Sequence, residues 1–247
     1  MIYRLRPACE TTIDELKNEY LWFSKPCLFK DNTRDANISA FVNKNEGLEQ
    51  ALSRIYTKLG IEEYINRSRH IGICCFTDRL PKNRNNWSLF PNGLNSIAIE
   101  YDETKLLNEF QKIGKGNPFI PVEYVYNPLS LEIDNGNTYM RETIDDNSYL
   151  LHNIDGEIRY DANHGMQKIM TLLLSRISKE YESQHEIRVF LSGIHLICDD
   201  SKSGYQMNVS NDCISKIFIP KRVVNRNKNF IESLTAIESI AHKLDFQ

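Results

Sequence analysis

The sequence predicts an α+β fold in which mostly antiparallel strands carry helices on their faces and ends. Short runs of alternating apolar and polar residues indicate strands, and longer runs with helical spacing indicate amphipathic helices. The two kinds of segment follow each other without an internal repeat or a heptad pattern. A length of 247 residues fits one domain, which we place over residues 1–247.

The composition is ordinary for a globular protein, with 41% hydrophobic and 26% charged residues. The net charge of −3 excludes a global basic field that would hold nucleic acid, although a local basic patch is compatible with it. The N-terminus lacks the pattern of a signal sequence, and no apolar run approaches the roughly 18 residues of a membrane span. We therefore expect a cytoplasmic protein that does not enter a membrane.

The first elements are predicted as a strand, a short helix and a second strand. Arg4 and Arg6 alternate on the first strand and share one face, which by spacing alone is typical of an exposed edge strand. Thr12 and Glu15 have the spacing of a capping box at the start of the helix. Ser24 is either a turn residue or, because the two strands are expected to be neighbours, a candidate site residue.

The rest of the chain alternates in the same way. Helices are predicted over residues 46–66, 103–112, 162–181 and 230–244. Strands are predicted over residues 71–76, 95–101, 120–126, 194–198, 205–209 and 214–219, with a hairpin turn at residues 134–137. The polar segment 27–45 is a long loop, and such loops in compact domains are more often functional than decorative.

Common site motifs are absent from the sequence. The six cysteines show no C-x-x-C spacing and the six histidines form no zinc-type pair, so we expect no metal site. Cys74 and Cys75 are adjacent in a strand and are expected to behave as small hydrophobes. No Walker A or G-x-G-x-x-G motif occurs. Trp87 is either a core anchor or a stacking surface for a ligand ring.

The segment of residues 184–191 is the sharpest candidate for chemistry. Gln184, Glu186 and Arg188 would share one face of a strand, opposite an apolar row that faces the core. One interpretation is an edge strand with a solvated charged face. The other is a catalytic Gln-x-Glu motif, which depends on the N-terminal strands for its partners.

Together these segments resemble a bacterial family known only as a domain of unknown function. Its members open on Tyr-x-Tyr-Arg, continue with Leu-Trp-Phe-Ser-x-Pro and a Cys-Phe strand, and close on Glu-x-Glu-Trp-Arg. The matching segments here are Ile2-Tyr3-Arg4-Leu5-Arg6, Leu21-Trp22-Phe23-Ser24-Lys25-Pro26, Ile73-Cys74-Cys75-Phe76, Trp87 and Gln184-His185-Glu186-Ile187-Arg188. The chain departs from the family after Pro26 and after Trp87, as a divergent member would.

The order of an Arg, a Ser and a late Glu also resembles the ADP-ribosyltransferase superfamily, which implies a split core of two short sheets with NAD as substrate. Cleavage of nicotinamide from NAD passes through an oxocarbenium-like ribose, which one carboxylate can stabilise. The resemblance implies that Glu186 is this carboxylate, that Ser24 orients it and that Gln184 faces the acceptor. It implies further that Arg6, then Arg4, bind the pyrophosphate.

Tyr3 and Trp87 complete the NAD-binding residues that the resemblance implies. The acceptor would be a protein or a nucleic acid, and the setting a toxin or phage-defence effector, with an antitoxin or another partner protein. A hydrolytic NAD glycohydrolase would use the same residues without an acceptor. A catalytically silent relative would be an interaction protein. A nuclease is the weakest alternative, because no Asp, Glu and Lys cluster has metal-site spacing.

Overall fold

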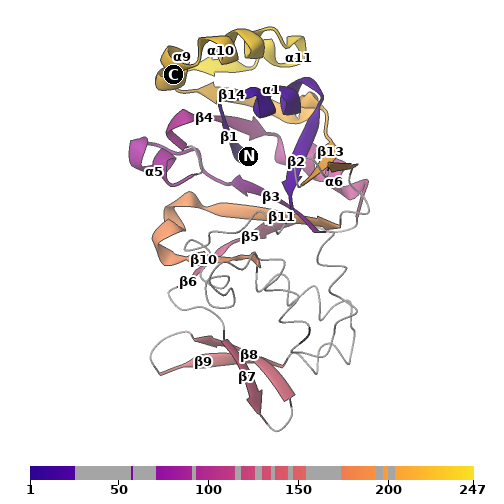
Figure 1. Cartoon of the computed structure of the whole chain (residues 1–247), viewed down its shortest axis with the longest axis vertical. Coiled ribbons are helices and arrows are strands. Elements are labelled where there is room, and N and C mark those ends of the chain that lie inside the picture. The colour runs from indigo at the N-terminus through magenta and orange to yellow at the C-terminus, as the bar shows by residue number, and fades with distance from the viewer. Residues whose placement is uncertain are drawn as a thin grey trace. The chain divides into compact units, whose positions relative to one another are not determined.

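The computed structural model describes residues 1–25, 57, 71–90, 93–114, 118–125, 130–134, 137–143, 147–153, 174–192, 197–199 and 204–247 (Figure 1). The chain divides into two compact units. Unit 1 comprises residues 1–24, 72–121 and 183–247, and unit 2 comprises residues 25–71 and 122–182. The single domain over residues 1–247 stays a prediction beside this division. The predicted loop 27–45 and nearly all of the predicted helix 46–66 lie outside the described residues.

Unit 1 is built on a mostly antiparallel ten-stranded sheet with flanking helices, which confirms the predicted mixture of strands and helices. Its strands are β1 (Ile2–Pro7), β2 (Tyr20–Ser24), β3 (Ile71–Thr77), β4 (Ser96–Tyr101), β5 (Phe119–Pro121), β11 (Glu186–Ser192), β12 (Ile197–Asp199), β13 (Gly204–Asn208), β14 (Ile214–Ile219) and β15 (Leu244–Phe246). The main path is β12-β13-β2-β3-β1-β4-β14-β15, and β11 pairs with both β3 and β5.

Among the described residues, β3 is joined to β1 and to β2 through one backbone pair each. β1 meets β3 through Tyr3 and Thr77, and β2 meets β3 through Ser24 and Ile73. We call β1, β4, β14 and β15 the first wing, and β2, β13 and β12 the second wing. The expectation that β1 is an edge strand is wrong, because β1 pairs with β4 over its whole length and lies between β4 and β3.

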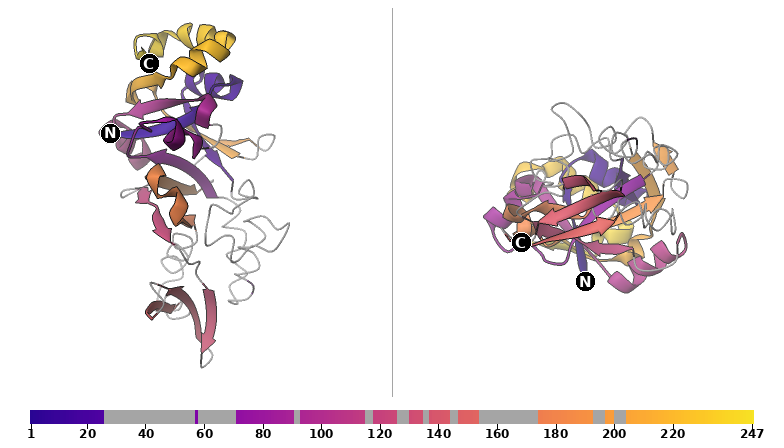
Figure 2. Two further views of the ribbon diagram at one scale, coloured as in Figure 1. Left: turned by 90° about the vertical axis from the view of Figure 1, so that its left-hand side faces the viewer. Right: turned by 90° about the horizontal axis from the view of Figure 1, so that it is seen from below.

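The described helices of unit 1 are short. They are α1 (Glu10–Lys17), α5 (Arg84–Ser88), α6 (Glu103–Gln111), α9 (Lys221–Arg226), α10 (Lys228–Thr235) and α11 (Glu238–Ala241). In Figures 1 and 2, α1 lies beside the C-terminal helices. The single helix predicted over 230–244 is wrong, because Ile237 is extended between α10 and α11 and the last residues pair with β14.

The start of α1 differs from the predicted capping box. Its N-cap is Cys9, which makes no side-chain capping hydrogen bond. Thr12 Oγ1 donates instead to the carbonyl oxygen of Pro7 at 2.6 Å. Glu15 turns away from the helix terminus and binds arginines of β1. The helix is therefore confirmed, but its two signal residues tie it to the first strand.

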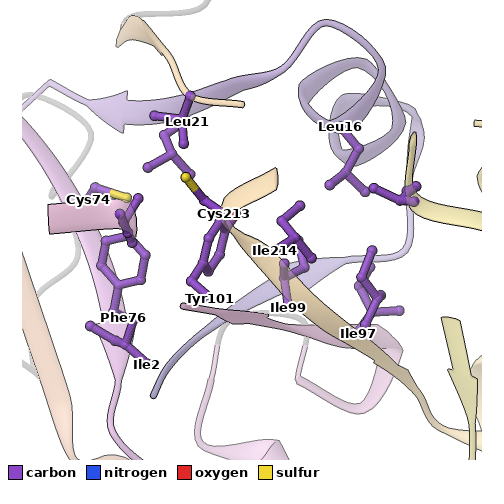
Figure 3. Packing of buried hydrophobic residues seen from close by; sticks show 14 of the residues in the cluster. Ile2, Leu16, Leu21, Cys74, Phe76, Ile97, Ile99, Tyr101, Cys213 and Ile214 are labelled. Atoms are coloured by element: carbon purple, nitrogen blue, oxygen red, sulfur yellow. The ribbon is translucent and has the colours of Figure 1, made fainter. Parts of the chain in front are cut away.

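The main core of unit 1 lies between the sheet and the helices on one of its faces. Figure 3 shows Leu16 of α1 and Leu21 of β2 near the row of Ile97, Ile99 and Tyr101 on β4. All six residues of β4 are buried, as expected of a central strand. A second apolar cluster on the opposite face consists of Trp87, Ala98 and Phe218, with Tyr3, Leu5, Leu80 and Leu94 packed against it.

The described part of unit 2 contains two small sheets. β6 (Glu123–Val125) pairs in parallel with β10 (Arg176–Ser178), and β7 (Ser130–Asp134), β8 (Asn137–Thr143) and β9 (Tyr149–Asn153) form an antiparallel sheet. The predicted hairpin is confirmed by the pairing of Asp134 with Asn137. The predicted strand 120–126 is instead two strands, β5 and β6. The predicted helix 162–181 is wrong at its end, where pairing with β6 overrides the helical pattern.

Membrane insertion through a helix is not indicated by the described residues. None of the helices seen there is long and apolar enough to cross a bilayer.

Candidate functional site

Glu186 and Arg188 form a buried ion pair on β11. Arg188 Nε donates to Glu186 Oε1 at 2.8 Å. The Arg188 side chain is 2% exposed and the Glu186 side chain is 1% exposed. The opposite row, Ile187, Val189 and Leu191, packs against the main core as predicted. The interpretation as a solvated edge strand is wrong, because β11 lies between β3 and β5 and its charged face is buried.

This pair changes the electrostatics expected of a catalytic carboxylate. The negative charge of Glu186 faces the guanidinium of its own strand neighbour, which compensates it locally. Two charges removed from water stabilise each other only while both remain, since removal of one partner leaves the other buried and uncompensated. The contact therefore assigns Glu186 a structural part in the strand.

Gln184 is also buried, at the end of a 3-10 turn, η4 (Lys179–Gln184). Its side-chain Nε2 donates to the carbonyl oxygen of Leu89 at 2.5 Å. Its own carbonyl oxygen accepts a hydrogen bond from Thr77 Oγ1 at 2.6 Å. His185 follows with a φ of 47°, a left-handed conformation that reverses the chain into β11. Gln184 thus joins β3, the segment after α5 and β11.

Arg4 and Glu15 close the gap between the two wings of the sheet. Arg4 is bound to Glu15 Oε1 and donates through Nη2 to the carbonyl oxygen of Trp22 at 2.8 Å. Glu15 Oε1 also accepts from the backbone N–H of Trp22 at 2.9 Å. Two side chains therefore satisfy the backbone groups of Trp22 that a neighbouring strand would pair in a continuous ladder.

Arg6 completes this cluster at its margin. Arg6 Nε lies 2.7 Å from Glu15 Oε2, within ion-pair distance but not aligned as a hydrogen bond. The Arg6 side chain is 18% exposed, whereas that of Glu15 is 3% exposed. Burial alone would raise the pKa of Glu15, but Arg4 and Arg6 outweigh it and hold this pKa below its usual value. The carboxylate is therefore ionised and shared by two arginines.

Ser24 lies far along the sheet from the Gln184 contact. It is partly exposed at the end of β2 and pairs with Gly204 and Ile73. Thr77, which binds Gln184, lies four residues beyond Ile73 on β3, or about 13 Å at the usual rise per residue. The structure consequently places Ser24 away from Gln184, and the predicted role of Ser24 in orienting Glu186 stays a prediction.

Tyr3 lies on the sheet face opposite Arg4, in the second apolar cluster. Burial and the nearby Glu100 carboxylate, which accepts the Tyr3 hydroxyl, raise the pKa of Tyr3. Adjacent residues of a strand point to opposite faces, so Tyr3 and Arg4 cannot line one site on one face of the sheet. The predicted grouping of these two residues around NAD stays a prediction, which this placement does not support.

Trp87 is buried in the same cluster on α5, with 6% exposure, as expected of a core anchor. Its ring is covered by Arg222 of α9, whose Cζ lies 4.9 Å from the ring centroid. Arg222 Nε donates to the carbonyl oxygen of Leu94 at 2.7 Å, which fixes the guanidinium in place. The ring face that a ligand would stack on is thus occupied by an arginine.

The described part of the chain shows no metal centre, and the buried Cys74 is not a reactive thiol. No group of three His, Cys, Asp or Glu side chains there could hold a metal ion. Burial, opposed by the charge of Arg4, raises the pKa of the Cys74 thiol to about 11, so this thiol is protonated at neutral pH. Cys74 packs in the main core, where it behaves as a small hydrophobe.

Several residues that organise these contacts were not assigned their roles from the sequence. Glu15 had a local signal, but its spacing to Thr12 suggested a cap rather than an ion pair. Arg188 belongs to the segment that carries the Gln-x-Glu motif, but no role was predicted for it. Thr77 and Arg222 carry no local signal, because their partners are distant in the sequence.

Comparison of the chain with protein-family models, curated proteins and solved structures finds no match. The resemblance to an uncharacterised bacterial family and to ADP-ribosyltransferases therefore stays a prediction.

Proposed function

We propose that this chain acts by binding a macromolecular partner, and that its buried ion pairs maintain the fold rather than cleave NAD. The observation that carries this proposal is the Glu186–Arg188 pair, in which the carboxylate side chain is 1% exposed. A carboxylate that stabilises a ribosyl cation has to contact the ribose. Glu186 has instead a guanidinium partner at 2.8 Å.

The residues expected to bind the pyrophosphate support the same proposal. Arg4 is committed to Glu15 and to the carbonyl oxygen of Trp22, so its guanidinium fork is directed into the protein. Arg6 shares the second oxygen of Glu15. If either arginine moved toward a ligand, the buried Glu15 carboxylate would lose part of its compensating positive charge, which costs free energy.

The test measures nicotinamide release from NAD by the purified protein, together with the shift in Tm on addition of NAD or ADP-ribose. We expect no release and no shift, because a ligand that does not bind the folded state does not stabilise it. Release that scales with protein concentration would contradict the proposal. Ser24→Ala, at a partly exposed position, separates a true activity from a contaminant, since a contaminating activity would be unchanged by it.

A second candidate is the NAD-dependent ADP-ribosyltransferase, or an NAD glycohydrolase with the same residues. One observation favours it: the sheet divides at β3 into two wings, as a split core would. In this candidate NAD is the substrate, Glu186 acts after separation from Arg188, and Gln184 meets a protein or nucleic-acid acceptor. A toxin or phage-defence role with an antitoxin partner belongs to this candidate and is tested by the same nicotinamide assay.

A further inference from the structure

Three arginines gather on unit 1 around Trp87. Arg222 of α9 covers the Trp87 ring and is held by the carbonyl oxygens of Leu94 and, at 3.4 Å, Gly93. Burial and the positive charges of Arg84 and Arg226 lower the pKa of Arg222, so both arginines act on it electrostatically. Arg84 and Arg226 are exposed.

The geometry of the two helices explains the gathering. Arg226 lies four residues after Arg222 on α9 and therefore on the same helical face. Arg84 lies three residues before Trp87 on α5, one turn from the ring that Arg222 covers. Like charges at such positions repel each other, so the folded chain holds an arrangement that is unfavourable without an anion.

Within the described part of the chain, no ion pair offsets this charge. Among the ion pairs of the described residues, none joins Arg84, Arg222 or Arg226 to an acidic side chain. The sequence shows the same bias, since residues 79–90 and 220–229 contain no Asp or Glu. Their cationic residues are Arg79, Lys82, Arg84, Lys221, Arg222, Arg226 and Lys228. In a chain of net charge −3, this is a local concentration of positive charge.

The same two segments are rich in asparagine, a side chain that both donates and accepts hydrogen bonds. Some of these asparagines serve the fold: Asn83 caps α5, and Asn227 Nδ2 donates to Asn95 Oδ1. Asn85, Asn225 and Asn229 are exposed beside the arginines in sequence. Arginine, lysine and asparagine are side chains that contact phosphates and sugars of nucleic acids.

We propose that the surface formed by Arg84, Arg222 and Arg226, which we call the arginine surface, binds the sugar-phosphate backbone of a nucleic acid. Guanidinium groups bind phosphate oxygens in a fork geometry. Cations distributed over two helices suit successive phosphates of a polymer better than one phosphate group. Because Trp87 is buried and covered by Arg222, its ring is not available for base stacking. Contacts to phosphates carry no sequence information, so we expect binding that is independent of sequence.

The inference does not depend on the choice between the two candidate functions, since it uses none of the residues around Glu186 or Glu15. It names the kind of partner that the binding proposal leaves open. Under the transferase candidate the same surface would retain a nucleic-acid acceptor. The experiment therefore measures binding and not catalysis.

The test is fluorescence anisotropy of a labelled single-stranded oligonucleotide of mixed sequence, titrated with the full chain over a series of salt concentrations. At physiological salt we expect a Kd on the order of 10⁻⁴–10⁻⁶ M, as for non-specific binding, and tighter binding at low salt. The double variant Arg84→Gln/Arg226→Gln should flatten the slope of log K against log salt by about 1.4, since each phosphate that is no longer neutralised accounts for about 0.7. Both positions are exposed, so the Tm should not change.

The control removes two positive charges elsewhere on unit 1, in Lys17→Gln/Lys112→Gln, both at exposed positions. This variant should keep the salt slope of the unchanged protein. Equal weakening by both double variants would overturn the proposal, because net charge alone would then explain binding. Absence of binding at low salt would also overturn it. So would binding of a phosphoserine peptide in preference to the oligonucleotide, which would identify a phosphoprotein partner instead.

Discussion

The carboxylate of Glu15 accepts a hydrogen bond from the backbone N–H of Trp22 at 2.9 Å. β13 pairs with Trp22 along one edge of β2, and among the described residues β3 pairs with β2 only through Ser24. The same carboxylate binds Arg4, which donates to the carbonyl oxygen of Trp22. Glu15 of α1 and Arg4 of β1 thereby pair with backbone groups of β2, a strand of the second wing. A charged cluster that resembles a ligand site in the sequence is, in the structure, a junction between β strands.

Glu186→Gln should destabilise the protein by about 3–5 kcal/mol, because it removes the negative charge from a buried ion pair with Arg188. The measurement is the free energy of unfolding in urea. Glu182→Gln is the matched control, since Glu182 is exposed and pairs only with Lys179 at the surface, and it should stay within about 0.5 kcal/mol. Equal stability of the two variants would show that the buried pair contributes nothing.

The stability contributed by Glu15 should depend on pH in the acid range. Its folded-state pKa lies below the ordinary value of 4.5, so its contribution is present above pH 4.5 and is lost as the pH falls through the folded-state pKa. At neutral pH, Glu15→Gln should cost about 3–5 kcal/mol, as for removal of one partner of a buried pair. The difference between the two proteins in free energy of unfolding should shrink on acidification below pH 4.5.

Urea unfolding at a series of pH values checks this expectation. Glu232→Gln, at an exposed position of α10, is the control and should show a difference near zero throughout. A difference in free energy of unfolding between Glu15→Gln and the unchanged protein that stays constant to the lowest pH at which both proteins fold would contradict the prediction. The ionised carboxylate would then not stabilise the contact between β1, α1 and β2.

Gly93→Ala should be among the most damaging small substitutions in unit 1. A Cβ at this position would lie 1.5 Å from the carbonyl oxygen of Trp87, a backbone atom that cannot rotate away. We expect a loss of about 3 kcal/mol or more, because the chain around Trp87 must shift. Thermal unfolding followed by tryptophan fluorescence reports it. Gly114→Ala, where a Cβ meets nothing within 4 Å, should change stability by at most about 1 kcal/mol.

Thr77→Val should weaken the attachment of η4 to β3. The substitution removes the hydroxyl that donates to the carbonyl oxygen of Gln184 at 2.6 Å and leaves that buried oxygen with one donor fewer. The expected cost is about 1–3 kcal/mol in urea unfolding. Thr235→Val removes an exposed hydroxyl on α10 and serves as the control. Unchanged stability of Thr77→Val would show that the Thr77 hydroxyl does not anchor Gln184.

Elements with strong local periodicity were predictable from the sequence. The strands at residues 71–76, 95–101 and 214–219 and the helix at 103–112 coincide closely with β3, β4, β14 and α6. In each, alternating or helical apolar spacing agrees with the tertiary environment, so local preference and packing point the same way. The turn between Asp134 and Asn137 was equally clear, because an Asn-Gly pair favours a two-residue hairpin.

The candidate site was less predictable, because its contacts join distant residues. Glu15 lies close to Arg4 only after α1 folds back on β1, and no spacing rule distinguishes this from a capping box. The charged face of β11 was expected in solvent or in an active site, yet pairing with both β3 and β5 buries it. Charge patterns thus indicated which residues matter, while their roles depended on long-range strand order.

The single pairs that join β3 to β1 and to β2 within the described residues have a consequence for cooperativity. A sheet normally unfolds as one unit because each strand shares many hydrogen bonds with the next, and here those shared bonds are few between the wings. The first wing, joined by a continuous ladder between β1 and β4, should open as one foldon, and β2 with β13 as another. Amide hydrogen exchange should therefore divide the strands of unit 1 into two groups with different exchange rates. Exchange of the Trp22 amide should depend on its hydrogen bond to Glu15 rather than on the opening of a neighbouring strand.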